Sequence, residues 1–566
     1  MNKETARGLE AADAALAGLN LGALPASPMR DALLVLVNLV ETLQGQVLAL
    51  RTENQQIRDE IARLKGEQGR PDIKGKKPPA PPISSERERR SSTPWKKGSK
   101  RDQLRIDRTE RIEVDPSLLP ADAERKGYVQ VVVQELVFQV VTTEFLKAKW
   151  WSASEKRSYL ATLPPGYVGQ FGPSVKSFVL ALATAHVSET AVRTLLKDAG
   201  VVISAGQIAT WLTKGHDRWE AERDAIGEAA FRGSPYQLLD DTVTRVNGVS
   251  AACQVLTSPL ATIYRTTPAK DRQTVVDVLR LGRPRRFQRT DVADQLFAVS
   301  SLSAETKRVL AETPAETAWD AATLDAFFAE RLPQLGPQHR KVVSDTLAIA
   351  AYRADPEFPS VRLLVTDDAP QFAGVTEDHA LCWVHEGRHY KRLTPFLRQH
   401  RELVEGFLTR FWGYYHELLA SSARPSPEEQ VRLSADFDAL FETTTGYQAL
   451  DDRIALTRAK KKQLLQVLDH PEVPLHTNAA EQAVRRRVRK RDISFGPRTW
   501  DGARAWDIFQ TIAATAAQYG VSFFAYLHDR LTEGNQFPSL SSLIDQRAAS
   551  LRLGVSWDYP NPSAQN

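Results

Sequence analysis

The chain has 566 residues, of which 25% are charged and 42% hydrophobic, and its formal net charge is +5. This composition excludes a wholly disordered protein, and the length predicts three or four domains. Only Cys253 and Cys382 are present, which excludes a disulfide scaffold and an all-cysteine zinc ribbon and favours a reducing compartment. The first residues lack a signal-sequence pattern, and no uninterrupted apolar run approaches about 18 residues. We therefore expect a cytoplasmic protein without a membrane partner.

Residues 33–64 carry an unbroken heptad repeat within a predicted N-terminal helical segment, residues 1–69. Its a and d positions are Leu33, Leu36, Val40, Leu43, Val47, Leu50, Asn54, Ile57, Ile61 and Leu64. This choice of residues favours a parallel two-stranded coiled coil whose register is fixed by a pair of Asn54 side chains. We expect homo-oligomerisation through Leu36, Leu43, Leu50, Asn54, Ile57 and Leu64. The alternative is an amphipathic helix packed on its own chain, because the two periodicities differ little over this length.

Residues 70–112 have the composition of a basic, proline-rich linker. Between Lys65 and Arg111 there are 15 lysines and arginines against 7 acidic residues, a net charge of +8. Prolines cluster at 78–82, so the segment cannot bury a core and is expected to act as a tether. Its basic side chains either hold DNA without sequence specificity or only keep a linker solvated, and the sequence leaves both alternatives open.

Two small modules are expected next. Residues 113–160 contain a strand-like alternation, clearest at 131–141, that predicts a hairpin or small β module. Residues 161–232 predict a helical domain in which Ser188 and Ser204 begin two helices separated by a turn at Gly200. This order is similar to a helix-turn-helix, which inserts its second helix into a DNA major groove, although any small helical bundle gives the same pattern.

Residues 233–500 have the element order of a ribonuclease-H-like α/β domain. The expected elements are a three-stranded meander, a helix and a fourth strand, at 237–246, 250–257, 261–265, 274–279 and 361–367. Helical insertions are expected at about 285–355 and 395–470, and a helical C-terminal segment at 501–566. The predicted fold class is multidomain α+β, and the step from element order to a particular fold is an analogy.

Three acidic residues are the candidate metal ligands. Asp240 and Asp367 end apolar strands, and Glu481 opens a helix rich in arginine. Mg²⁺ prefers oxygen ligands, and two ions about 4 Å apart activate the attacking oxygen and stabilise the leaving oxygen in phosphoryl transfer. The alternative roles are local: both aspartates can cap turns, and Glu481 can complete a capping box with Asn478. The element order and the neighbouring arginines together favour a shared metal site beside nucleic acid.

A second group of potential ligands has spacing that a zinc site can use. Its members are His379, Cys382, His385 and His389. Neutral histidines beside a basic DNA groove need no metal, so we do not expect zinc at this position.

The motifs around the three acids resemble those of the bacterial insertion-sequence-66 transposases, which are DDE recombinases. Leu239-Asp240-Asp241-Thr242 is similar to the family's Asp-(Glu/Asp)-Thr motif, and Thr366-Asp367-Asp368 to its second aspartate. Asn478-Ala479-Ala480-Glu481-Gln482 is similar to its Asn-x-Ala-Glu-Arg motif, and residues 381–388 to its Cys-Trp-x-His-x-Arg-Arg stretch. With the zipper, the basic linker and the helical tail in similar order, the resemblance spans most of the chain.

The resemblance implies a transposase that cuts DNA at the ends of its element and joins the freed 3′ hydroxyl to target DNA. Asp240, Asp367 and Glu481 would be the catalytic ligands of two Mg²⁺ or Mn²⁺ ions, whereas Asp241 and Asp368 would point elsewhere. The expected DNA-binding residues are Arg485, Arg489, Lys490, His385 and Arg388. The partners would be double-stranded DNA at the element ends and target, a second copy of the chain and helper proteins of the same element, at the bacterial nucleoid.

The chain departs from the family pattern in three ways. The cysteine pairs that many members carry before the helical domain are absent, 127 residues separate Asp240 from Asp367, and Gln482 follows Glu481 where arginine is usual. Two other functions remain open at this point. One is a metal-dependent nuclease that performs no strand transfer, and the other is a noncatalytic, oligomeric DNA-binding protein derived from a transposase.

Overall fold

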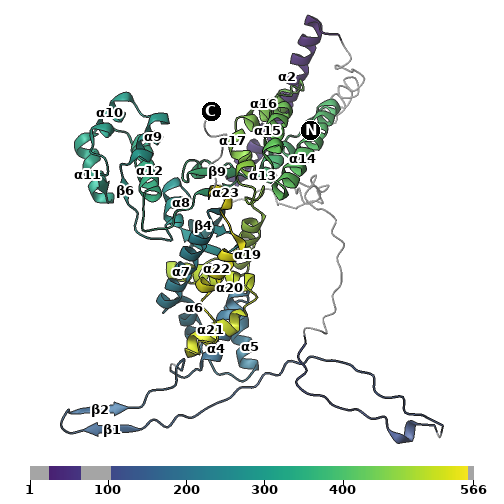
Figure 1. Cartoon of the computed structure of the whole chain (residues 1–566), viewed down its shortest axis with the longest axis vertical. Coiled ribbons are helices and arrows are strands. Elements are labelled where there is room, and N and C mark those ends of the chain that lie inside the picture. The colour runs from purple at the N-terminus through teal and green to yellow at the C-terminus, as the bar shows by residue number, and fades with distance from the viewer. Residues whose placement is uncertain (1–24, 65–103, 121, 168, 559–566) are drawn as a thin grey trace.

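A computed structural model describes residues 25–64, 104–120, 122–167 and 169–558 of this mixed α+β chain (Figure 1). A central sheet lies between helices, and two helical insertions extend from it in different directions (Figure 1). The first 24 residues, the tail from residue 559 and the predicted linker up to residue 103 lie outside the described residues.

The sheet has five strands in the order β5-β4-β3-β8-β9. They are β3 (Tyr236–Val246), β4 (Val249–Thr257), β5 (Thr262–Thr267), β8 (Leu363–Thr366) and β9 (Asp378–Leu381). The first three are antiparallel, whereas β8 is parallel to β3 and β9 is parallel to β8. The predicted meander and the predicted apolar strand are confirmed, and β9 is an additional strand that was not predicted from the sequence.

Helices cover both faces of the sheet. On one face, Leu239, Leu256, Ile263 and Leu364 pack against α8 (Arg272–Leu279) and α12 (Pro337–Arg353). On the other face, the strands pack against α19 (Asn478–Ser494) and α20 (Trp500–Gln518) through two clusters of buried side chains. The members of these clusters include Leu238, Leu363, Val365, Ala480, Val255, Tyr264, Ala483 and Ala514. The acidic helix is therefore held against the sheet by burial of apolar surface.

Both helical insertions are present where the sequence predicted them. The first forms its own apolar core and comprises β6 (Phe287–Gln288), α9 (Asp291–Val299), α10 (Ala304–Glu312), β7 (Ala318–Trp319), α11 (Ala321–Arg331) and α12. The second contains α14 (Arg398–Ala423), α15 (Pro427–Phe441), α16 (Gln448–Arg458), α17 (Lys461–Leu464) and α18 (Gln466–Asp469). It shares a large aromatic core with α13 (Trp383–Lys391), which follows β9 directly.

A helical body lies below the sheet in Figure 1 and contains the predicted pair of short helices. Its elements are α4 (Pro173–Thr184), α5 (Glu189–Asp198), α6 (Ala205–Thr213), α7 (Asp217–Gly233), α21 (Phe523–Thr532) and α22 (Leu540–Leu551), with α23 (Val555–Asp558) after them. Ser188 and Ser204 cap α5 and α6 by accepting hydrogen bonds from backbone amides, as predicted. Gly200, with φ of +90°, makes the turn between the two helices.

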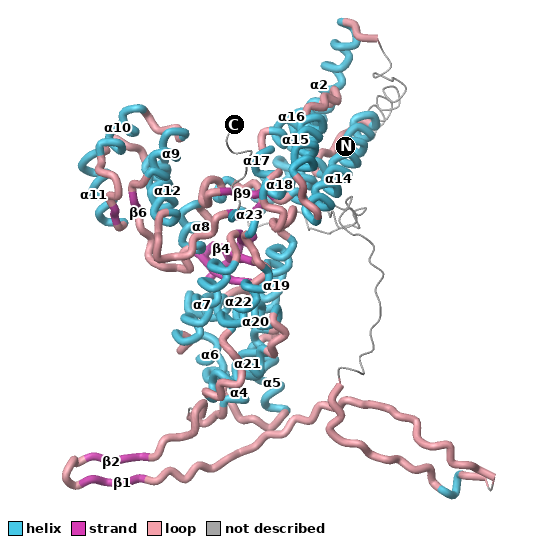
Figure 2. The backbone as a smooth tube through the Cα atoms, viewed as in Figure 1, coloured by secondary structure: helices cyan, strands magenta, loops and turns pink. Residues whose placement is uncertain are grey.

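Of the hairpin or small β module predicted at 113–160, the described residues form a short hairpin. The segment begins with the short helix η3 (Pro116–Leu118), and residues 128–148 form no strand. Only β1 (Lys149–Ser152) and β2 (Arg157–Leu160) pair there, as a hairpin (Figure 2). The alternating valines at 129–133 are exposed to solvent. Alternation predicts a strand only where a partner strand and a core exist, and the described residues provide neither beside this segment.

Helix α2 (Pro28–Leu64) uses one side to pack on its own chain. Val37 is buried against Leu397, and Asn38 exchanges 2.9 Å hydrogen bonds with the backbone of residues 446 and 448. The Glu41 carboxylate accepts hydrogen bonds from the amides of Phe396 and Leu397, at the start of α14. The alternative of a helix packed in cis therefore holds for the first part of α2.

Apart from Leu33, which packs beside Val37, the heptad seam of α2 lies on the other side and stays exposed. Leu36, Leu43, Leu50, Ile57 and Leu64 are all solvent-accessible, and the amide of Asn54 donates to the Leu50 carbonyl of the same helix. Within the described residues, one helical stretch, Pro28–Ile61, is long and apolar enough to cross a membrane. The sequence did not indicate this stretch because polar residues interrupt its apolar runs. The helix makes polar contacts with the starts of α14 and α16, as a helix packed on protein does. It does not indicate a membrane protein.

Replacing Glu41 with alanine should release α2 from α14. We expect faster amide hydrogen exchange at Phe396 and Leu397 and a loss of about 1 kcal/mol of local stability, because both amides lose their acceptor. Glu53→Ala, an exposed position on the same helix, is the control. Unchanged exchange at both amides would show that the helix does not dock in this way in solution.

Candidate active site

The pairing of β3 with β8 puts two acidic residues side by side. Tyr236 pairs with Leu363 and Leu238 with Val365, so two residues further on Asp240 and Asp367 stand at the same level. Side chains alternate along a strand, and both aspartates therefore face the same side as Leu238 and Val365. That side packs against Ala480, in the first turn of α19.

The third acid enters from this turn of α19. Glu481 is largely buried, accepts a 2.8 Å hydrogen bond from Arg388 Nη2, and lies 3.6 Å from His385 Nε2. Arg485, one turn later, is 3.5 Å from its second carboxylate oxygen. The alternative capping box is absent, because Asn478 is the first helical residue and the N-cap, Thr477, makes no side-chain cap.

The three carboxylates act on one another electrostatically. Burial, together with the negative charges of Asp367 and Glu481, raises the pKa of Asp240 to about 6. The Asp241 amide, which donates a 2.8 Å hydrogen bond to Asp240, and the charge of His385 oppose this shift. A carboxyl group whose pKa is raised by burial and by neighbouring acids is typical of a site that a cation completes.

The acids next to the two aspartates have other partners. Asp241 accepts hydrogen bonds from Lys270 Nζ at 3.1 Å and from Gln371 Nε2 at 3.3 Å. Asp368 binds Lys460 and lies 3.6 Å from His389, and these two groups hold the pKa of Asp368 well below its usual range. These partners hold Asp241 and Asp368 away from Glu481. Asp367 itself accepts a 3.1 Å hydrogen bond from the Ala369 amide, as a residue that caps a turn does.

Helix α13 supplies the positive side chains nearest the acids. Burial opposes protonation of His385, but Cys382 and Glu481 outweigh it, and the pKa of His385 is raised. Arg388 donates to both His385 Nε2, at 2.9 Å, and Glu481. Both residues were expected to contact DNA, which stays a prediction; the structure places them around Glu481, where they balance its charge and orient it.

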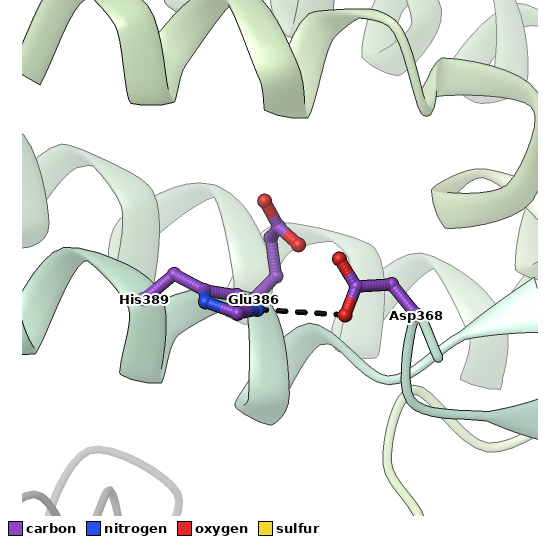
Figure 3. Close-up of side chains that lie close together, drawn as sticks. All are labelled: Asp368, Glu386 and His389. Atoms are coloured by element: carbon purple, nitrogen blue, oxygen red, sulfur yellow. Dashed lines mark ion pairs between the residues drawn. The ribbon is translucent and has the colours of Figure 1, made fainter. Parts of the chain in front are cut away.

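The four side chains with zinc-like spacing do not converge. His379 Nε2 bonds Thr366 at 2.7 Å, Cys382 pairs with His385, and His389 faces Asp368. Across the described ranges, one group meets the geometry of metal ligands: Asp368, Glu386 and His389, whose ligand atoms lie within 4.8 Å of one another (Figure 3). Glu386 was not among the residues predicted from the sequence, although its spacing of three residues from His389 on a helix was the available signal.

The arginine-rich helix α19 has a buried and an exposed side. Arg485, with 70% of its side chain exposed, and Arg486 and Arg489 face solvent, whereas Arg487 is buried in an ion pair with Asp507. Lys490 was expected to bind DNA, but it is 7% exposed and its ammonium donates to the Ala183 carbonyl near the end of α4. Burial lowers the pKa of Lys490 to about 8. Its role is to join α19 to the helical body, so we remove it from the predicted DNA-binding set.

Part of the chain matches a family of known proteins. Residues 363–505, which include Asp367, α13 and Glu481, match the family model described as "Transposase IS66 family". This match agrees with the family that the motifs indicated. A relative, the uncharacterized protein y4jO of Sinorhizobium fredii (strain NBRC 101917 / NGR234), is 29% identical over 337 residues, which cover 56% of this chain and 99% of that protein.

The family implies a divalent metal ion, and the chemistry of the three acids suits one, although among the described residues only Asp368, Glu386 and His389 have ligand atoms within 4.8 Å of one another. Three carboxylates supply oxygen ligands, which Mg²⁺ and Mn²⁺ prefer. The raised pKa of Asp240 means that its ionised form lacks a counterion, a deficit that a bound cation would remove.

Asp240→Asn should stabilise the metal-free protein at alkaline pH. The pKa of Asp240 rises from 3.8 to about 6 on folding, so ionisation of this group destabilises the fold. The loss of stability is absent below about pH 4, grows as the pH rises from about 4 to about 6, and is complete above about pH 6. We expect the variant's advantage in free energy of unfolding to increase by up to about 3 kcal/mol from pH 4 to pH 8. Denaturant unfolding in chelator measures it.

Asp241→Asn is the matched control, since it removes a neighbouring carboxylate that binds Lys270. It should show no such gain. An Asp240→Asn protein that is no more stable than wild type at pH 8 in chelator would contradict the claim that ionisation of Asp240 destabilises the metal-free fold.

Proposed function

We propose that this chain is a DNA transposase in which Asp240, Asp367 and Glu481 hold two Mg²⁺ or Mn²⁺ ions. It would cut DNA strands at the ends of its element and transfer them into target DNA. The observation that carries the proposal is the pairing of β3 with β8, which brings the two aspartates to one level beneath Glu481. The IS66 domain supports the transposase class.

The fold supports the same proposal. Three antiparallel strands, then two parallel ones, with the acidic helix across the face that carries both aspartates, is the arrangement we interpret as ribonuclease-H-like. Both long separations between the acids are filled by helical insertions that leave the order of the sheet intact. We infer that the insertions were added around one catalytic unit.

Each side chain then has a role in phosphoryl transfer. Two divalent ions at the acids would activate the attacking oxygen and stabilise the leaving oxygen of an in-line displacement. Arg388 orients Glu481. The charge of His385 lowers the pKa of Asp240 and so favours its ionised form. Arg485 is exposed beside Glu481 and can bind a DNA phosphate next to the scissile one.

DNA is the expected substrate and would extend along α19 toward the helical body. Arg486 and Arg489 are exposed. The pKa of His186, which lies between α4 and α5, is lowered first by burial and then by the positive charges of Lys490, Arg489 and Arg486. The exposed arginines therefore lie near the helix-turn-helix-like pair α5 and α6. We propose that this pair and the exposed arginines bind one DNA duplex.

The most direct test of the function uses Mg²⁺ or Mn²⁺ and DNA that carries candidate element ends. Asp240→Asn, Asp367→Asn and Glu481→Gln should each reduce cleavage by more than about 100-fold, since loss of partners outside the ligand shell alone can cost that much. Asp241→Asn should cleave normally. Gel analysis separates nicked, cut and joined products.

The outcomes distinguish the alternatives. Cleavage that is equal in wild type and all three variants sinks the proposed ligand set. Cutting without joining favours a nuclease, and DNA binding without either product favours a noncatalytic binding protein.

We also propose that the chain forms a homodimer through the exposed seam of α2. Leu43→Glu with Leu50→Glu should convert the dimer to a monomer in sedimentation experiments, because two charges would enter the apolar seam. Val35→Glu is the matched control, because Val35 is an exposed apolar residue of the same helix outside the a and d positions. If the double variant stays dimeric at micromolar concentration, another surface mediates association.

A further inference from the structure

The cluster of Asp368, Glu386 and His389 adjoins the acid site but has no part in the chemistry proposed above (Figure 3). Its two carboxylates already have protein cations as partners. Lys460 binds Asp368 and lies 3.2 Å from Glu386 Oε2, and Arg453 binds Glu386 Oε1. The cluster is therefore built as an ion-pair network, in which the Lys460 ammonium stands between the two carboxylates as a metal ion would.

Glu386 depends on these cations. It is 2% exposed, and besides Arg453 and Lys460 it accepts a 2.5 Å hydrogen bond from Thr457 Oγ1. A buried carboxylate that loses its partners is strongly destabilising. All three partners lie on α16 or directly after it, so the second insertion neutralises a charge that belongs to α13.

Helix α13 connects this network to the acid site. His385 and Arg388 face Glu481, whereas Glu386 and His389, one position further along, face Asp368. Each pair is three residues apart and so occupies one side of the helix. A rotation of α13 would move both pairs together, and Lys460 in addition holds Asp368, which adjoins the proposed ligand Asp367.

We propose that Lys460 is a positioning residue for the metal site, acting through Glu386 on α13 and through Asp368 on the end of β8. This inference rests on the proposed function. It also gives the second insertion a role in the site, because the ammonium that the insertion supplies fixes the distance between Asp367 and the helix that orients Glu481.

The test is Mn²⁺ binding by the full chain, measured by electron paramagnetic resonance, together with denaturant unfolding. Lys460→Met should weaken Mn²⁺ binding about 10-fold, the effect typical of a residue that orients ligands. Lys460→Arg should recover part of the affinity because it keeps the charge. DNA cleavage by Lys460→Met should fall most at low Mg²⁺ and recover at high Mg²⁺. The control is Lys462→Met, since Lys462 is 82% exposed and only approaches Asp378, at 3.9 Å.

Two results would overturn the proposal. One is a folded Lys460→Met protein with wild-type Mn²⁺ affinity, which would make the lysine purely structural. The other is tighter binding or an additional ion, which would make the cluster a metal site that the lysine occupies. If Lys460→Met does not fold, Lys460→Gln is judged by the same criteria. Wild-type Mn²⁺ binding by Asp240→Asn, Asp367→Asn and Glu481→Gln would instead refute the proposed function, whatever Lys460 does.

Discussion

The parallel pairing of β8 with β3 is the constraint on which the rest of the structure depends. It sets Asp240 and Asp367 level with each other although 127 residues separate them. A shift of one residue would turn one aspartate to the opposite face of the sheet, away from α19. The register is held by apolar side chains on both faces, so the strands' burial fixes the position of the acids.

A second constraint is charge. The site gathers three carboxylates in a partly buried place, and the raised pKa of Asp240 shows the cost of doing so. His385, Arg388 and Arg485 offset part of that charge around Glu481. A separate set, Arg453 and Lys460, neutralises Glu386 and Asp368 on the other side of α13. The two sets of cations lie on different sides of α13, and those near the site gather around Glu481.

Sequence reasoning succeeded where a local pattern determines the structure. The meander, the apolar strand before Asp367 and the caps at Ser188 and Ser204 all follow from periodicity and capping within a few residues. It failed where the outcome depends on distant partners. The alternating segment at 131–141 has no partner strand among the described residues, and Lys490 is buried because α4 covers it.

The site divides in the same way. Asp240, Asp367 and Glu481 were identified by motifs; the pairing of β3 with β8 supports their grouping, which stays a prediction. The link between Glu386 and Lys460 was missed, because 74 residues separate the two and neither belongs to a motif that requires the other. The heptad seam with Asn54 and the a and d leucines also depends on a distant partner. It predicts a second helix, which a single chain does not contain, and the seam is exposed.

The central claim, that the three acids form one metal site, can be tested by affinity cleavage. Fe²⁺ is substituted for Mg²⁺ on the full-length protein, and hydroxyl radicals generated at the ion cut the backbone nearby. The account predicts cuts near residues 240, 367 and 481 together, all suppressed by excess Mg²⁺. Cuts near Arg453 and Lys460 without cuts near Asp240 and Glu481 would place the ion in the neighbouring cluster and contradict the account.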